Sequence, residues 1–429
     1  MNKKTLLALL TINTFCAQTI VFGQEKKSEV VTQESIQLET DEIFDKLVQI
    51  RREFHENPEL AGKEKKTQEV IKKYLLDLGL QVKTYIYGYG IVGVLEGAKK
   101  GKKIAWRAEM DALPNDFPDK SDFKSNVKGV QHGCGHDVHM AIALGIAEVL
   151  AKNKKSLHGT IYFIFQPEEE TFVGAKRITE NKIFTKFKLD EIYALHVTGL
   201  AVGQIMVKSN EMYAYQKEIG IQFKNALPNE EVKELTSKIR KSLVRSDNGS
   251  KPWEIQYISD SKIGLMNPNT IFKDYLIAEE NFRTYSKNDV FHINAELYET
   301  DAARLKNIIP TINKVIKDSN YASQLISIKF IKENPTVLND PNLTHTSINT
   351  LDNIYGKGFV TTDYGQVPYF NDDFAYFQQK TPGVYFLLGG SNFKKGMIAM
   401  NHAPNFQVDE ECIRIGVRAF SSLIFERGK

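Results

Sequence analysis

The sequence predicts an α/β protein in which helices flank a mostly parallel sheet and a smaller α+β domain is inserted. Continuous apolar runs at 161–165, 192–195 and 384–388 are typical of strands that are covered on both faces. Helical stretches lie between such runs, notably over 139–150. Within 210–334 the elements follow the order strand, helix, two strands, helix and strand, which is the pattern of a ferredoxin-like unit.

The first part of the sheet domain begins with two helices. Apolar residues at helical spacing predict one helix from about Asp41 that stops before Pro58, and a second over 64–78. Gly79 follows the second helix, at a position where glycine commonly ends a helix. Extended segments are expected next, over 81–87, 91–96 and 103–108.

The inserted domain has its own pattern. Alternating apolar residues over 219–223 predict a half-buried strand, and an apolar stripe over 232–243 predicts a helix that begins at Asn229. The remaining elements are expected to be strands over 274–285, 290–299 and 324–331 and a helix over 305–316 with a kink at Pro310. The predicted boundaries are 39–209 for the first part of the sheet domain, 210–334 for the inserted domain and 335–429 for the second part of the sheet domain.

The N-terminus has the features of a signal peptide. Two lysines precede a mostly apolar stretch, and the residues up to Gly23 suit cleavage before Gln24. The stretch falls short of the ~20 strongly apolar residues that a membrane span needs. Lipid anchoring through Cys16 is disfavoured, because a phenylalanine is a poor residue before a modified cysteine. We therefore expect residues 1–23 to be removed on export to the periplasm or the medium, residues 24–38 to form a flexible leader, and the mature chain to have no membrane span.

Composition narrows the function classes. The 429 residues carry 56 Lys and Arg against 53 Asp and Glu, a formal net charge of +3, and no long basic run. Nothing in this balance indicates nucleic-acid binding. Only Cys134 and Cys412 remain after removal of the predicted signal peptide, so the exported protein is not built on a disulfide framework.

Metal-binding residue types follow the predicted strands. The members of this set share one position, just past the end of a strand or at the start of the next helix. They are Asp111, Cys134, His136, His139, Glu169, Glu170, His196 and His402. Ligands bind at this edge of open α/β sheets. Thiolate, imidazole and carboxylate donors together suit divalent transition metals such as Zn²⁺, Mn²⁺, Co²⁺ or Ni²⁺.

Five of these residues, Cys134, His136, Glu170, His196 and His402, are candidate ligands. Five donors are too many for one tetrahedral ion that keeps an open position. They suit two ions about 3.5–4 Å apart that share a bridging water. Each motif alone also fits a plain turn or helix start, but their joint placement at successive strand ends favours a metal site.

These motifs resemble those of the dinuclear-metal amidohydrolases that include hippurate hydrolase, N-acyl-amino-acid amidohydrolase and indole-acetyl-amino-acid hydrolase. The matching stretches run in family order through the sheet domain, at 51–60, 107–114, 132–139, 166–170, 194–196, 339–341, 372–374 and 402. The resemblance implies a zinc-peptidase-like α/β fold with an inserted lid that mediates contacts in a homodimer. It also implies two bound metal ions and hydrolysis of the amide between an acyl group and an amino acid, in a small N-acyl amino acid or short peptide.

The resemblance also assigns roles to individual residues. The five candidate ligands match the metal-ligand positions, and Glu169 matches the general base that activates the bridging water. Asp111 matches a catalytic acidic position beside the metal centre, and His139 matches a residue that holds the substrate.

The chain departs from the family pattern around the Glu pair, where Glu168 and Thr171 replace the usual alanine and glycine, and at two further places. Glu109 stands where the family has aspartate. The family's first lid strand runs into a Gly-Gly-His-Ala stretch whose histidine reaches the substrate, whereas residues 218–228 contain no histidine here. Losing one preorganised donor costs roughly 10²–10³ in turnover unless it is replaced. Three interpretations therefore stay open: an aminoacylase, a dipeptidase or cell-wall-fragment peptidase with the same metal centre, and a catalytically weak metal- or ligand-binding homologue.

Overall fold

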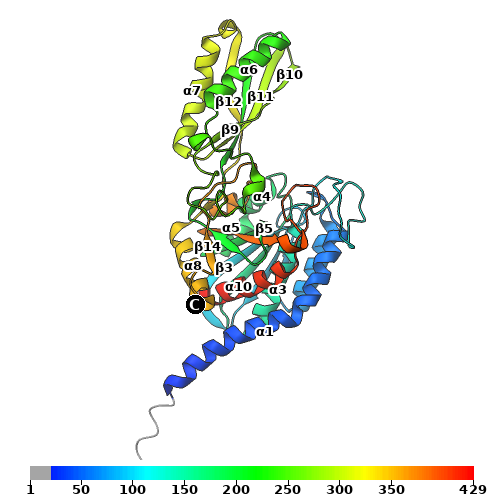
Figure 1. Cartoon of the computed structure of the whole chain (residues 1–429). Coiled ribbons are helices and arrows are strands. Elements are labelled where there is room, and N and C mark those ends of the chain that lie inside the picture. The colour runs from blue at the N-terminus through cyan, green and yellow to red at the C-terminus, as the bar shows by residue number, and fades with distance from the viewer. Residues whose placement is uncertain (1–20) are drawn as a thin grey trace, which may run out of the picture.

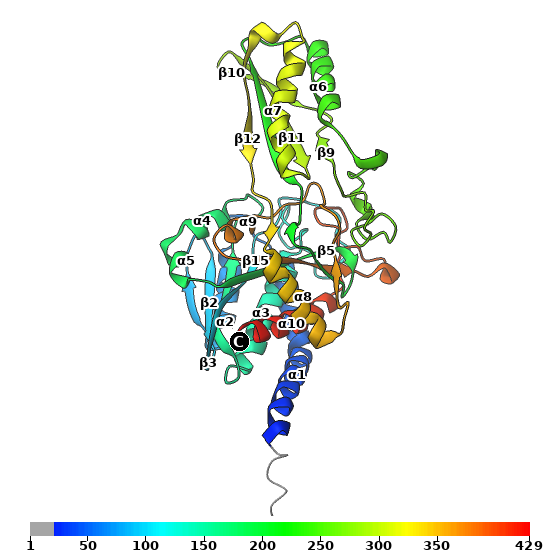
Figure 2. The same cartoon turned by 90° about the vertical axis from the view of Figure 1, so that its left-hand side faces the viewer.

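A second, elongated domain stands on a sheet domain (Figures 1 and 2). The computed structural model describes residues 21–429. The sheet domain contains one eight-stranded sheet with the strand order β1-β2-β4-β3-β5-β15-β6-β14. Its strands are β1 (Gln81–Thr84), β2 (Ile91–Glu96), β3 (Lys99–Glu109), β4 (His158–Gln166), β5 (Glu191–Ala201), β6 (Ile205–Val207), β14 (Val360–Thr362) and β15 (Gly383–Ser391).

The centre of this sheet is parallel. The pairs β4–β3, β3–β5 and β5–β15 run parallel, as does β14–β6. The pairs β1–β2, β2–β4 and β6–β15 are antiparallel. Every residue of β15 is buried, as expected of a strand between two layers. The mixed, mostly parallel sheet confirms the predicted fold class.

Helices cover both faces of the sheet (Figure 2). The larger core lies between one face and α1 (Val21–Glu56), α2 (Lys65–Asp77), α3 (His136–Lys152), α8 (Pro341–Tyr355) and α10 (Glu411–Arg427). The smaller core lies between the other face and α4 (Gly174–Glu180), α5 (Lys182–Phe187) and α9 (Ala375–Gln378). Within residues 21–429, no helix is both long and apolar enough to cross a membrane.

Residues 24–38, for which the sequence predicts a flexible leader, belong to α1 in the structure. Ile36 is fully buried against the sheet domain, and the hydroxyl of Ser35 donates to Oδ1 of Asn153 at 3.1 Å. These contacts extend the helix beyond its strongly amphipathic part, since packing rather than propensity stabilises most helices. The signal peptide stays a prediction: residues 1–20 lie outside the described residues, and the expected cleavage site before Gln24 falls within α1.

The inserted domain, which we call the lid, has an antiparallel sheet with the order β10-β11-β8-β12, and β9 also pairs with β11. Its strands are β8 (Tyr215–Phe223), β9 (Leu276–Ala278), β10 (Arg283–Lys287), β11 (Val290–Glu299) and β12 (Leu325–Glu333). The helices α6 (Asn229–Leu243) and α7 (Ala302–Lys317) share one apolar core with this sheet. The ferredoxin-like order is confirmed, although the single strand predicted over 274–285 is divided into β9 and β10.

Residues 244–275 leave the lid after α6 and come back to it at β9; we call them the return segment. They include the short helices η1 (Asp247–Gly249) and η2 (Ile255–Tyr257). Ile258, Leu265 and Phe272 pack in the smaller core of the sheet domain. The remaining short elements are β7 (Asn210–Glu211), β13 (Leu338–Asn339), η3 (Ala322–Gln324) and η4 (Phe393–Lys395).

Candidate metal centre

The central strands and the start of α3 meet at the candidate site. β4, β3, β5 and β15 are parallel neighbours, so their carboxyl ends lie at one edge of the sheet. Cys134 and His136 lie in the turn into α3, on either side of Gly135. Gly135 has a φ of +96°, and a Cβ there would lie 2.3 Å from Cγ1 of Val197. The tight turn that presents both donors therefore requires glycine.

The five candidate ligands lie together. Sγ of Cys134 is 3.4 Å from Nε2 of His196 and 3.1 Å from Nε2 of His402. Oε1 of Glu170 is 3.3 Å from Nε2 of His402 and 3.8 Å from Nε2 of His136. The structure thus brings into one cluster all the residues that the sequence analysis named as ligands.

Hydrogen bonds on the outer side of two imidazoles determine which nitrogen faces the cluster. Nδ1 of His136 donates to the carbonyl oxygen of Asp111 at 2.7 Å, and Nδ1 of His196 donates to that of Val197 at 2.8 Å. A neutral imidazole carries a single N–H, so each Nε2 is left with its lone pair directed at the cluster. Metal-binding histidines are held in this way.

Within the described part of the chain, the buried Nε2 of His136 has no hydrogen-bond partner, and the buried Oε1 of Glu170 has only its 3.3 Å contact with Nε2 of His402. Buried polar atoms almost always have a partner, so these two indicate a cation between them. Sulfur, imidazole and carboxylate donors also match the ions expected from the sequence, Zn²⁺, Mn²⁺, Co²⁺ or Ni²⁺. The residues present therefore fit a metal site.

Burial controls the protonation of the cluster. Burial, helped by the nearby His139, lowers the pKa of His196 to about 4, so its imidazole is neutral and able to bind metal. Burial also raises the pKa of the Cys134 thiol well above its ordinary value, and the carboxylates of Glu170 and Glu169 add to this rise. A bound cation reverses the shift at cysteine, because a coordinating thiol is deprotonated.

Glu169 lies beside the ligands. Its Oε2 is 3.7 Å from Nε2 of His136, and its side chain lines the same cavity as Glu170. Burial, and then the carboxylate of Asp372, raise the pKa of Glu169 well above its ordinary value. A carboxyl group with a raised pKa can both accept and return a proton near neutral pH, which is the behaviour that a general base and acid needs.

Asp111 lies behind the ligands and forms hydrogen bonds with their backbone and side chains. Its Oδ1 and Oδ2 accept the backbone N–H groups of Glu169 and Glu170, both at 3.0 Å. Its carbonyl oxygen accepts from His136. The side chain is fully buried, and Asp111 is not among the residues that line the cavity. These contacts position a ligand and the base, while the catalytic role of Asp111 stays a prediction.

His139, for which substrate binding stays a prediction, is hydrogen-bonded through both nitrogens of its ring. Its Nδ1 is 2.8 Å from Oε2 of Glu109, and its Nε2 accepts the backbone N–H of Val197 at 2.9 Å. Both ring nitrogens are occupied, so neither is available to a substrate. Glu109 also pairs with Arg107, which explains how the longer glutamate is used where the family has aspartate. His139 therefore links α3 to the ends of β3 and β5.

The cluster opens into a cleft between the lid and the sheet domain. The cleft encloses about 650 Å³ of space, part of it open to the outside. Its lining residues are Cys134, Glu169, Glu170, Phe172, His196, Tyr213, Gln216, Lys332, Tyr369, Phe370, Asn371, Tyr385 and His402. The lid contributes Gln216 from β8 and Lys332 from β12.

Several of these lining residues were missed by the sequence analysis. Residues 369–371 directly precede the 372–374 motif, so their position was a usable signal. Lys332 had no such signal, because lysines also occur elsewhere along β12. Its place in the cleft follows from the packing of the lid on the sheet domain.

Residues 218–228, which stand where the family has its histidine stretch, contribute no side chain to the lining of the cleft. β8 contributes Gln216 to the cleft near its start and ends at Phe223, so the stretch that follows lies at the opposite end of the strand. None of residues 224–228 lines the cleft. Among the described residues of the inserted domain, Tyr213, Gln216 and Lys332 line the cleft.

The fold and the donor cluster together define a metallo-amidohydrolase. The sequence profile of peptidase family M20/M25/M40 matches residues 105–426, and the chain belongs to this family. Thermostable carboxypeptidase 1 of Saccharolobus solfataricus is 31% identical over 418 residues, which cover 91% of this chain and 97% of that protein. IAA-amino acid hydrolase ILR1-like 4 of Arabidopsis thaliana is 28% identical over 397 residues, which cover 89% of this chain and 86% of that protein.

A solved structure shows the same fold. It is the YXEP protein of Bacillus subtilis, described as a dinuclear metal binding peptidase of the M20 family. The TM-score is 0.71 at 23% sequence identity, and the match covers 90% of this chain and 99% of that one.

Proposed function

We propose that this protein hydrolyses the amide bond of N-acyl amino acids or related short peptides, with two divalent metal ions and Glu169 as the general base. The observation that carries the proposal is the position of Glu169, whose Oε2 lies 3.7 Å from Nε2 of His136 at the edge of the donor cluster. The names of the relatives support the substrate class, since one is a carboxypeptidase and another an amino acid hydrolase.

The chain's own residues account for the proton transfers. The ions, when held by the five candidate ligands, would polarise the scissile carbonyl and acidify the attacking water. Glu169 accepts the proton of that water on its carboxylate and then passes it to the nitrogen of the leaving amine. Asp111 keeps Glu169 in place through the backbone N–H bond described above.

Lys332 supports a substrate that carries a free carboxylate. It is the only lysine or arginine among the residues that line the cleft, and its strand brings it to the lid side, across from the carboxylates of Glu169 and Glu170. Among residues 21–429, no carboxylate forms an ion pair with its ammonium group within 4.0 Å, since the nearby Glu333 and Glu218 pair with Lys217 and Arg283. An ammonium group in this position can hold the carboxylate of the amino-acid half of the substrate.

The test is a comparison of Glu169→Gln with Glu168→Gln. The first change removes the base and keeps the shape of the side chain, whereas Glu168 is a neighbour in sequence that does not line the cleft. We expect Glu169→Gln to retain bound metal and to lose at least about 100-fold in kcat, and Glu168→Gln to keep most of its activity. Metal content by elemental analysis and turnover of N-acyl amino acids with Mn²⁺ or Zn²⁺ are the measurements. Full activity of Glu169→Gln, or loss of its metal, would contradict the assignment.

The same assay decides between the alternatives. A panel that contains both N-acyl amino acids and dipeptides identifies a dipeptidase by faster turnover of the dipeptides. A protein that binds metal yet turns over no member of the panel is the weak binding homologue.

We also propose that the protein is exported and forms a homodimer through the lid. The lysines and the apolar stretch before Gly23 support export, and the resemblance to the family supports the dimer. Mass spectrometry of the mature protein should find Gln24 as its first residue. Light scattering on the wild type should give the mass of a dimer, and the mass of a monomer would contradict the proposal.

A further inference from the structure

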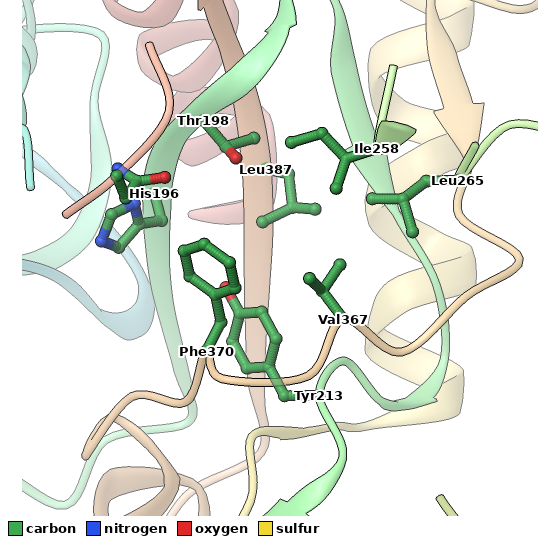
Figure 3. Close-up of a pocket in the computed structure, with 9 residues that line it drawn as sticks. His196, Thr198, Tyr213, Ile258, Leu265, Val367, Phe370 and Leu387 are labelled. Carbon is green, nitrogen blue, oxygen red and sulfur yellow. The ribbon is translucent and has the colours of Figure 1, made fainter. Parts of the chain in front are cut away.

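A narrow apolar chamber adjoins the cleft behind His196 (Figure 3). His196, Tyr213 and Phe370 line both spaces, so the two are direct neighbours. The other walls of the chamber are Thr198, Ile258, Leu265, Val367, Leu387 and Asn401. In Figure 3, His196 lies at one end of the chamber, and Ile258 and Leu265 lie at the other.

The far wall of the chamber comes from the return segment. Ile258 and Leu265 are 2% and 1% exposed, and the backbone N–H of Leu265 donates to the carbonyl oxygen of Ile258 at 2.9 Å. The N–H of Tyr364 in turn donates to the carbonyl oxygen of Leu265 at 2.9 Å, which ties the segment to the sheet domain. Buried side chains on a tied backbone form a fixed wall, so they limit what can enter.

The chamber is small. The centre of a water-sized group can reach only about 20 Å³ of it, compared with about 160 Å³ of the cleft. A single water needs about 10–15 Å³ on this measure, and a dry cavity of about 150 Å³ holds benzene. The chamber therefore has room for one or two methyl-sized groups, whereas an aromatic ring fits only if a wall moves.

The chemistry of the walls selects for an apolar group. No Asp, Glu, Lys or Arg is among the lining residues, so an ionised group would lose its hydration without gaining a partner. Lys332 lies in the cleft and not in the chamber. If the amino-acid half of the substrate binds at Lys332 and the scissile carbonyl lies at the donor cluster, the acyl half extends past His196.

We propose that the chamber holds the acyl group of the substrate and restricts it to a short aliphatic chain such as acetyl or propionyl, with Ile258 and Leu265 setting the limit. This inference rests on the proposed function and deepens it. Because the limit is steric, removing atoms from either wall residue should admit a larger acyl group.

The test compares N-acetyl-, N-propionyl- and N-benzoyl-methionine on the metal-loaded enzyme. The wild type should show a kcat/KM at least about tenfold higher for the acetyl than for the benzoyl substrate. Leu265→Ala and the milder Ile258→Val should raise the ratio of benzoyl to acetyl turnover, by about tenfold or more for Leu265→Ala. Trp253→Ala is the control, because Trp253 lies on the same segment but is 44% exposed and outside the chamber.

A wild type that prefers the benzoyl substrate would overturn the inference, as would wall variants that change all three substrates equally. If no acylated methionine is turned over, the proposed function fails, and calorimetric binding of the same three compounds still tests the chamber. The inference is supported if the wild type binds N-acetyl-methionine more tightly than N-benzoyl-methionine and Leu265→Ala reverses this order. It is overturned if the wild type and the variants bind the compounds equally.

Discussion

The carboxylate of Asp111 accepts the backbone N–H of Glu169 at 3.0 Å, and its second oxygen accepts the N–H of Glu170 at the same distance. One buried side chain therefore sets the spacing between the predicted base and a predicted metal ligand. Because the carbonyl of Asp111 also orients His136, this residue controls three parts of the centre without lining the cleft.

Asp111→Asn should loosen the centre. The amide keeps one acceptor but directs an N–H group at a backbone N–H, so one of the two hydrogen bonds is lost. We expect metal affinity to fall about 10–100-fold, as for other residues that orient metal ligands. Calorimetric titration with Mn²⁺ measures it. Asp190→Asn is the control, since Asp190 accepts the backbone N–H of Lys103 at 2.8 Å outside the site. Unchanged metal affinity in Asp111→Asn would contradict the positioning role.

His139→Phe should act on stability and not on substrate binding. The change removes the acceptor for the N–H of Val197 and the partner of Glu109, and an unpartnered buried group costs about 1–3 kcal/mol. We expect a lower melting temperature and, with saturating metal, a KM within about twofold of the wild type. A tenfold rise in KM with no change in melting temperature would restore the substrate-binding role.

Lys332→Met should weaken binding of substrates that have a free carboxylate. The loss of a charge-assisted hydrogen bond of about 1.5–3 kcal/mol corresponds to a KM increase of roughly 10–100-fold. Substrates whose carboxylate is replaced by a carboxamide should be unaffected. Lys329→Met provides the matched control on β12, because Lys329 does not line the cleft. An equal effect on acids and amides would show that Lys332 does not bind the carboxylate.

Asp119 should make stability depend on pH in the acid range. Burial raises its pKa, but the hydrogen bonds from His55 and from the backbone of Ser121 outweigh burial and leave the pKa at about 2, below the ordinary 3.8. A depressed carboxyl pKa contributes stability that is present above the unfolded value and is lost as pH falls through the folded value. Asp119→Asn should therefore lower the melting temperature at about pH 5, and its difference from the wild type should shrink from about pH 4 to about pH 2. If the difference in melting temperature between Asp119→Asn and the wild type stays constant over this pH range, the ionised Asp119 does not contribute the pH-dependent stability.

Local patterns predicted the sheet domain and the donor cluster because both depend on strands. A strand buried on both faces has a continuous apolar run, and a polar residue directly after it has to lie at the sheet edge. His196 and Glu170 were identified in this way. The hydrogen bonds of Asp111 and His139 were not predicted, because proximity to a metal centre does not distinguish a residue that faces the substrate from one that faces the backbone behind the ligands.

Tertiary contacts decided the remaining differences. The strand predicted over 274–285 is interrupted where a carboxylate oxygen of Glu279 accepts the backbone N–H of Glu296 at 2.9 Å, which takes a donor away from the ladder. The return segment has no local pattern that tells which domain it packs on. Lys332 reaches the cleft only because β12 ends there.

The return segment changes how the two domains are joined. An insertion needs two connections, but this chain passes between lid and sheet domain four times: into β8, out of α6, back into β9 and out of β12. The return segment, which forms the two middle connections, is hydrogen-bonded to the sheet domain. The carbonyl oxygens of Leu265 and Phe272 accept the N–H groups of Tyr364 and Gln366. A swing of the lid about its outer connections would therefore strain these bonds. The angle between the domains and the width of the space beside His196 are thus mechanically coupled.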